Sequence, residues 1–227
     1  MEKLSSNFRN MVLVLSGISI FSALALSSVF TVTQEPIAMS KMAKKLNAIK
    51  EVLPPYDRVE TKPTVVFEGA DSVCVYMAYD ANKQLVGGAV EAYSESGYNG
   101  HIGIIVGFDK EGAIVNYSVL EQHETPGLGA KMVNWFKSDL KKCSIIGKNP
   151  SLENLTLSKN GGSIDAITGA TISSKAFLFA VTNAHSAYAR IIEGLPVSTA
   201  TESNDSNNNS IEDKDAINTE MKGESNE

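Results

Sequence analysis

Cysteine and histidine are both scarce in this chain. The two cysteines, Cys74 and Cys143, lie far apart and form no Cys-x-x-Cys pair. The three histidines, His101, His123 and His185, share no spacing typical of metal ligands. We therefore predict no metal site. The cysteines are either one disulfide, if the domain faces an oxidising compartment, or two small buried apolar residues.

The chain also lacks a basic region. Lysine and arginine number 20 against 26 aspartates and glutamates, which gives a formal net charge of -6. Residues 198–227 account for this whole imbalance, so the rest of the chain is neutral and does not predict binding to nucleic acid. The same segment is rich in Asn, Ser and Thr and nearly free of large apolar residues, so it cannot bury enough surface to offset its ordering entropy. We predict a disordered acidic tail.

Charged residues are absent from residues 11–32, which are rich in Val, Leu, Ile, Phe and Ala. A helix of this length rises about 33 Å, enough for a hydrocarbon core of about 30 Å. A cleaved signal peptide is the alternative, since residues 23–25 resemble a cleavage site, but the apolar run continues to Val32 and favours an anchor. We predict a single transmembrane helix in contact with membrane lipid. Lysines follow the span, so the positive-inside count does not favour a cytoplasmic N-terminus; we place residues 1–10 in the cytoplasm because a short tail before a first span usually stays there.

The body that follows mixes helical and strand patterns. Apolar residues at three- and four-residue steps predict an amphipathic juxtamembrane helix over residues 39–53, ended by two prolines. Turn signals separate five predicted strands of an antiparallel meander, at residues 64–67, 73–79, 84–93, 102–108 and 113–120. Two helices are expected after them, one over residues 133–142 and one that starts near Thr171 and stops at Gly194 and Pro196. The predicted fold class is α+β, with one domain over residues 56–196.

Two short segments carry candidate chemistry. The first is a loop shaped by a proline and two glycines; its candidate residues are Glu124, Thr125, Gly127, Leu128, Gly129 and Lys131. The second is a helix entry made of Asp165, Thr168, Gly169, Ala170, Thr171, Ser173 and Ser174. Small residues before a helix let another group approach the backbone, and the free N–H groups of the first turn suit a phosphate. Taken alone, the second segment is more often the pattern of an ordinary helix cap.

Residues 165–171 resemble the flavinylation motif of the FMN-binding domain shared by the G subunit of the Rnf complex and the C subunit of the sodium-pumping quinone reductase. Residues 124–129 resemble that family's second hallmark, and residues 97–100 a weaker third one. The resemblance, with the N-terminal span, covers roughly residues 8–195 of the chain. It implies an FMN-binding domain and FMN joined by a phosphoester to Thr171, installed by a separate flavin transferase that uses FAD. The single short anchor and Thr168 are more similar to the Rnf protein than to the quinone-reductase protein.

The same resemblance implies the roles of individual residues. Gly169 and Ala170 give steric room, Ser173 and Ser174 help to hold the phosphate unless one of them is a simple helix cap, and the loop of residues 124–129 lies beside the flavin. Asp165 is either a loop brace or part of what the transferase reads. Lys131 either offsets phosphate charge or stabilises reduced flavin, unless it is simply solvated.

The function that the resemblance implies is electron transfer within a membrane complex of several subunits. Such complexes move electrons between ferredoxin and NAD and couple this to Na+ or H+ transport, and the present chain is expected to turn over no substrate of its own. The expected location is the bacterial inner membrane, with the flavin domain on the extracytoplasmic side. Alternatives are the quinone-reductase protein, a free-standing flavinylated carrier, and an anchored binding module without redox function.

Overall fold

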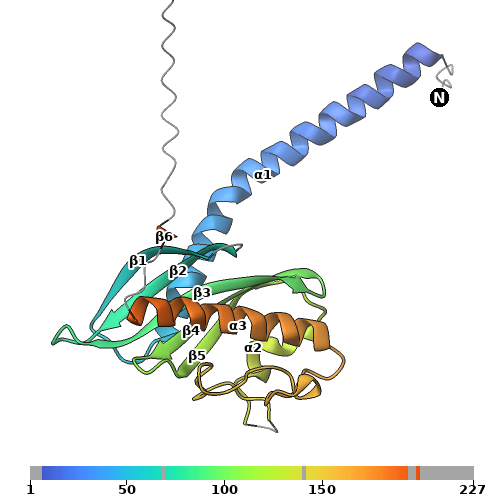
Figure 1. The fold of residues 1–227 in the computed structure, drawn as a ribbon. Helices are drawn as coiled ribbons and strands as arrows, with labels where there is room; N and C mark the ends of the chain where they lie inside the picture. The colour runs from blue at the N-terminus through green and yellow to red at the C-terminus, as the bar shows by residue number, and fades with distance from the viewer. Residues whose placement is uncertain (1–6, 68–69, 140–141, 194–197, 200–227) are drawn as a thin grey trace, which may run out of the picture.

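The computed structural model describes residues 7–67, 70–139, 142–193 and 198–199. A long N-terminal helix projects from a compact body, in which an antiparallel sheet carries a second long helix across one face (Figure 1). The structure is therefore an α+β fold with one apolar helix ahead of it, as the sequence predicts.

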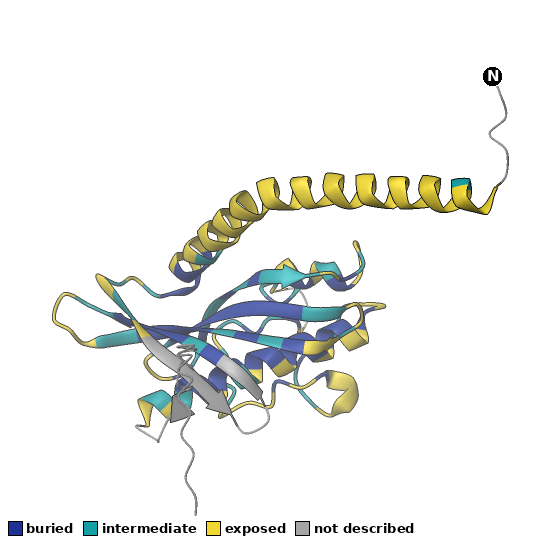
Figure 2. Ribbon diagram, turned by 90° about the horizontal axis from the view of Figure 1, so that it is seen from above, coloured by how far each residue is buried: buried dark blue, intermediate teal, exposed yellow. Residues whose placement is uncertain are grey.

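The first helix, α1 (Phe8–Val52), joins the predicted span and the predicted juxtamembrane helix into one element of 45 residues. Pro36 lies inside it. A proline removes one backbone hydrogen bond and kinks a helix without necessarily ending it, and Figure 2 shows α1 changing direction partway along its length. Within the described residues α1 is the one helix long and apolar enough to cross a membrane, and its most apolar part is exposed on all sides.

Only the last turns of α1 pack on the body. Ala48, Ile49, Val52 and Leu53 are buried against one face of the sheet. Met39, Met42 and Leu46, which the sequence places on the same amphipathic face, are exposed. The predicted face is therefore a core face only at its domain end, and the earlier turns contact the sheet through lysine side chains instead.

The sheet is a meander with the strand order β5-β4-β3-β2-β1-β6, and every neighbouring pair is antiparallel. Its first five strands are the five predicted, and a sixth is added: β1 (Arg58–Phe67), β2 (Ala70–Tyr79), β3 (Leu85–Gly97), β4 (Gly100–Asp109), β5 (Ile114–Gln122) and β6 (Ser198–Thr199). The last strand corrects the prediction for Ser198 and Thr199, which we had assigned to the disordered tail. An edge strand offers free backbone groups that can pair whatever the side chains are. The rest of the predicted tail lies outside the described residues.

Four helical segments follow β5. A 3-10 turn, η1 (Gly129–Lys131), leads into α2 (Met132–Trp135), which is shorter than predicted. The chain turns there because Phe136 is buried and stacks on Phe177, with 4.5 Å between the ring centroids. A second 3-10 turn, η2 (Ser158–Asn160), precedes α3 (Thr171–Ile192), which covers the face of the sheet opposite α1. Cys74 and Cys143 are free thiols.

Candidate functional site

Three loops meet in a pocket of about 620 Å³. One is the turn between β3 and β4, one follows β5, and one leads into α3. They come from distant parts of the chain, and the antiparallel meander brings the first two to the same end of the sheet. The wall of the pocket is formed by Tyr98, Glu124, Thr125, Leu128, Gly129, Lys159, Gly169, Ala170, Thr171, Ile172 and Ser173.

The start of α3 forms one side of this pocket. Gly169 has a φ of +79°, a left-handed conformation that side chains disfavour, so the chain can turn sharply into the helix there. Ala170 occupies the N-cap position and provides no side-chain cap. The N–H groups of the first helical turn have no intrahelical partner and carry the positive end of the helix dipole. Thr171, the first helical residue, is exposed at this position.

A buried carboxylate connects the two candidate segments. Glu124 is 5% exposed, and its Oε2 accepts a hydrogen bond of 2.8 Å from the hydroxyl of Ser173. Its Oε1 accepts one of 3.3 Å from the backbone N–H of Asn99, in the β3–β4 turn. Glu124 therefore ties all three sequence segments with resemblance to the flavin-binding family into one site, although Asn99 was not among the candidate residues.

Gly129 makes this contact possible. A Cβ at this position would lie 2.6 Å from the Ser173 hydroxyl and 2.7 Å from Glu124 Oε2, closer than real Cβ atoms approach such neighbours. Gly127 has a different reason to be glycine, because its φ is +77° and no atom would meet its Cβ within 4 Å. One glycine is thus required for close packing and the other for its backbone conformation.

Several candidate residues lie outside the pocket wall. Ser174 is buried and braces the helix start, where it accepts from the Ile167 N–H and donates to the Ala170 carbonyl. The Asp165 carboxylate accepts a hydrogen bond of 2.6 Å from Ser158, as expected for a loop brace. The remaining three, which are Gly127, Lys131 and Thr168, are exposed.

Three wall residues were not chosen from the sequence: Tyr98, Lys159 and Ile172, the last of which lies between the candidates Thr171 and Ser173. Tyr98 lies in the turn of the weaker third hallmark, and that motif was the signal available for it. Lys159 lies in η2, and no motif marks this position. Only the folded chain brings its side chain to the same pocket as Thr171. Because Glu124 is a buried acidic group in the same wall, the pocket has both an acidic and a basic residue.

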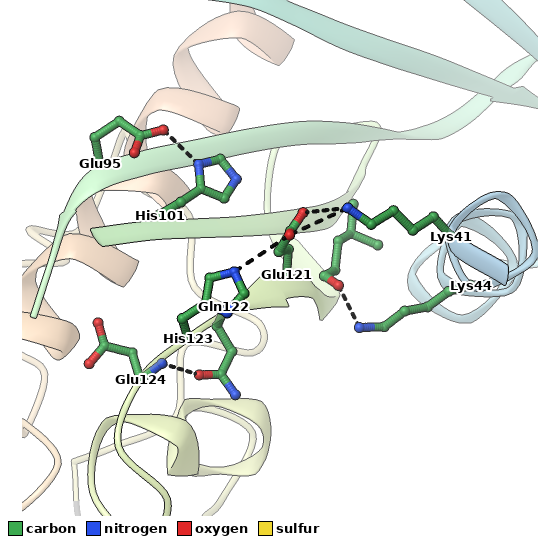
Figure 3. A network of polar contacts seen from close by, with 9 residues as sticks. Lys41, Lys44, Glu95, His101, Glu121, Gln122, His123 and Glu124 are labelled. Carbon is green, nitrogen blue, oxygen red and sulfur yellow. Dashed lines mark hydrogen bonds and ion pairs between the residues drawn. The ribbon is translucent and has the colours of Figure 1, made fainter. Parts of the chain in front are cut away.

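A polar network extends from the loop after β5 to α1 (Figure 3). Lys41 donates to both carboxylate oxygens of Glu121 at 3.4 Å, and this hydrogen bond and the lysine charge hold the pKa of Glu121 below its usual range. His123 also faces Glu121 at 3.6 Å, while Lys44 donates to the Leu120 carbonyl. The network fixes the domain end of α1 beside the strand that leads to the pocket.

The donors and the size of the pocket fit a mononucleotide flavin. A volume of about 620 Å³ is within the range of roughly 300–1,000 Å³ typical of small-molecule sites. The free N–H groups of the first turn of α3 and the Lys159 ammonium suit a phosphate, and the exposed side chains of Tyr98, Leu128 and Ile172 give an apolar surface for a ring system. No group of three or more His, Cys, Asp or Glu side chains gathers to hold a metal ion in the described part of the chain.

Comparisons with known proteins agree with this geometry. The model of the FMN-binding domain family matches residues 97–186, which include every residue of the pocket wall. The chain is 32% identical over 184 residues to the G subunit of the ion-translocating oxidoreductase complex of Aliivibrio fischeri, covering 76% of this chain and 86% of that protein. It is 30% identical over 184 residues to the protein of the same name from Methanosarcina acetivorans, covering 79% of this chain and 94% of that protein.

Among solved structures, the NqrC protein of Shewanella oneidensis is 18% identical, with a TM-score of 0.39 over 55% of this chain and 63% of that chain. The two relatives named above align with this chain over most of their own length, and the family match includes the loops that form the pocket. The chain therefore belongs to the family of G subunits of ion-translocating oxidoreductase complexes.

Proposed function

We propose that this chain is the flavin-carrying subunit of a membrane-bound ion-translocating oxidoreductase, and that the Thr171 hydroxyl carries FMN through a phosphoester. The observation that carries the proposal is the position of Thr171. It is exposed, it opens a helix of 22 residues, and it lies in the wall of the pocket that residues 124–129 complete.

Each part of the pocket has a task in this proposal. The first turn of α3 and Lys159 hold the phosphate, while Gly169 and Ala170 let it approach the backbone. The loop of residues 124–129 would lie beside the isoalloxazine ring, and Glu124 holds that loop against Ser173. When bound, FMN supplies reversible one- and two-electron redox chemistry, and the protein supplies position and electrostatics.

The attachment reaction requires a separate flavin transferase with FAD as the donor. The Thr171 oxygen attacks the phosphorus on the FMN side of the FAD pyrophosphate, the P–O bond to AMP breaks, and the hydroxyl proton passes to a base of the transferase. The products are the flavinylated chain and AMP. An exposed hydroxyl suits this reaction because a second protein has to reach it.

The role that we propose for this chain within a larger complex is based on its relatives. The relatives are named as parts of an ion-translocating complex, so the partners that we propose are the other subunits of such a complex, with membrane lipid around α1. We propose that electrons pass between ferredoxin and NAD, coupled to the transport of Na+ or H+, and that the chain turns over no substrate alone. The flavin domain is placed on the extracytoplasmic side of the bacterial inner membrane.

Covalent flavin on the denatured chain tests the proposal. The full-length chain is co-expressed with a flavin transferase, and the denatured band is examined for fluorescence and intact mass. Thr171→Ala should lose both the fluorescence and the mass of FMN, Thr171→Ser should keep part of them, and Thr168→Ala should load less. A Thr171→Ala band that still fluoresces would move the attachment elsewhere, and a wild-type band without flavin would refute the flavoprotein assignment.

A further inference from the structure

The contacts between α1 and β5 fix which end of the domain faces the membrane. The two elements run antiparallel, so β5 advances towards the membrane as α1 leaves it. The contacts that set this direction are, in order, the Glu51 carbonyl with Asn116, Lys44 with the Leu120 carbonyl, and Lys41 with Glu121. The end of β5, and the pocket loop after it, therefore point back along α1 towards its apolar half.

The pocket also lies close to the membrane when positions are measured along the axis of α1. From Val32, where the apolar run ends, to Lys41, α1 rises about 13 Å at 1.5 Å per residue. From Glu121, the partner of Lys41, the end of β5 and the loop after it advance at most about 10 Å towards the membrane by Glu124, at about 3.3 Å per residue. Glu124 is thus level with the part of α1 just outside the apolar run. Lipid headgroups occupy about 5–8 Å on each side of the hydrocarbon core, so the pocket loops reach this layer.

The side chains around the pocket mouth suit that layer. Tyr98 is 67% exposed, Ile172 54% and Leu128 42%; Tyr98 lies in the β3–β4 turn, Leu128 in the loop after β5 and Ile172 in the first turn of α3. Large apolar side chains are costly in water when they gather in one patch, and tyrosine is enriched at membrane interfaces. We call these three residues the apolar rim.

Basic residues accompany the apolar rim. Lys159 lies in the pocket wall, Lys131 ends the 3-10 turn after the pocket loop, and Lys175 lies in the first turns of α3. All three are exposed. Exposed lysines beside apolar side chains are the combination that binds anionic lipid surfaces.

We propose that the apolar rim rests in the lipid headgroup layer, so that the pocket opens onto the membrane surface. The proposal rests on α1 spanning the membrane and on its contacts with β5, and it does not depend on covalent FMN. One consequence is that a redox partner at or within the membrane surface would meet the pocket mouth directly.

Fluorescent probes on the full-length chain test the contact directly. The chain is reconstituted without other subunits into phosphatidylcholine vesicles, with or without phosphatidylglycerol, that contain lipid with a spin label on its headgroup. Single cysteines in a Cys74→Ala background carry an environment-sensitive fluorophore, and the remaining cysteine, Cys143, is 1% exposed. The rim variants are Tyr98→Cys, Leu128→Cys and Ile172→Cys, and the background without an added cysteine measures labelling of Cys143.

Two exposed apolar residues on the same domain serve as controls. Leu152 is 83% exposed in the loop before η2, and Ile192 is 41% exposed at the far end of α3. We expect the rim probes to be quenched about twofold or more over Leu152→Cys and Ile192→Cys, and more with the anionic lipid than without it. Equal quenching at rim and control positions in these vesicles would overturn the proposal. So would rim probes that lose solvent access only when other subunits are added, since a protein surface would then be the occupant.

Discussion

The hydroxyl of Ser173 donates a hydrogen bond of 2.8 Å to Oε2 of Glu124, two residues that are 49 positions apart in the sequence. Both are nearly fully buried, at 1% and 5% exposure. This contact joins the loop after β5 to the first turn of α3, which also holds Thr171. The position of Thr171 relative to the pocket loop therefore depends on a contact that Thr171 does not make.

Removing this contact should destabilise the domain. In Ser173→Ala the buried carboxylate of Glu124 loses one of its two donors, and a buried group without its partner costs about 1–3 kcal/mol. The measurement is urea unfolding of the full-length chain in detergent. Ser186→Ala is the matched control, since Ser186 lies on the same helix, is exposed, and donates to the Thr182 carbonyl of the preceding turn. Equal free energies of unfolding for the two variants would show that the buried contact contributes nothing.

The two loop glycines should respond differently to the same substitutions. Gly127→Ala strains a left-handed residue by about 1–2 kcal/mol, and Gly127→Asn should recover most of this because asparagine tolerates that conformation. Gly129→Ala places a Cβ between the Ser173 hydroxyl and Glu124 Oε2 and should cost about 1–3 kcal/mol as overpacking. Gly129→Asn should be no better than Gly129→Ala. Urea unfolding of the four variants checks this, and rescue by asparagine at both positions would contradict the packing role of Gly129.

His185 should make the domain sensitive to mild acid. It is 6% exposed on α3, its ring lies edge-on to Phe108 at 5.5 Å, and burial lowers its pKa below the ordinary value of 6.5. The unfolded chain therefore binds a proton at a higher pH than the folded chain does. The contribution of His185 to the free energy of unfolding is constant above its pKa in the unfolded chain, about 6.5. It falls as the pH drops from there through the lowered pKa of His185 in the folded chain.

Unfolding free energies measured between about pH 7.5 and pH 5 test this dependence. His185→Gln should flatten the fall, since glutamine cannot gain the proton. His123→Gln, at an exposed position, is the control for replacing a histidine with glutamine. A wild-type slope that survives in His185→Gln would assign the acid sensitivity to another group.

Much of the fold could be predicted from local patterns. Alternation and turn signals located five strands, because neighbouring strands joined by short turns depend on interactions close in sequence. The extent of the helices was harder to predict. Two helices were expected on either side of Pro36, yet a proline can kink a helix without ending it, and only the surrounding chain decides between the two outcomes. The helix after η1 stops at Trp135 because Phe136 turns inward to pack on Phe177, which lies on another element.

The candidate site was located by its motifs, but the sequence did not distinguish the roles of its two adjacent serines. Ser173 and Ser174 are adjacent and chemically identical, and both were expected to hold a phosphate. The helical turn separates their directions, so that Ser173 reaches Glu124 in the pocket wall while Ser174 braces Ile167 and Ala170 beneath it. Such a difference depends on the helix phase relative to the sheet, which no local pattern specifies.

The sequence by itself determined the apolar span, the meander and the two loops with candidate chemistry, because each depends on residues that are neighbours along the chain. Only the tertiary structure brought Lys159 to the pocket of Thr171, buried Glu124 between two distant segments, and turned the pocket loop back towards the apolar half of α1. These features depend on contacts between elements whose separation in the chain is long. Their geometry is fixed only when α1 and α3 pack on opposite faces of one sheet.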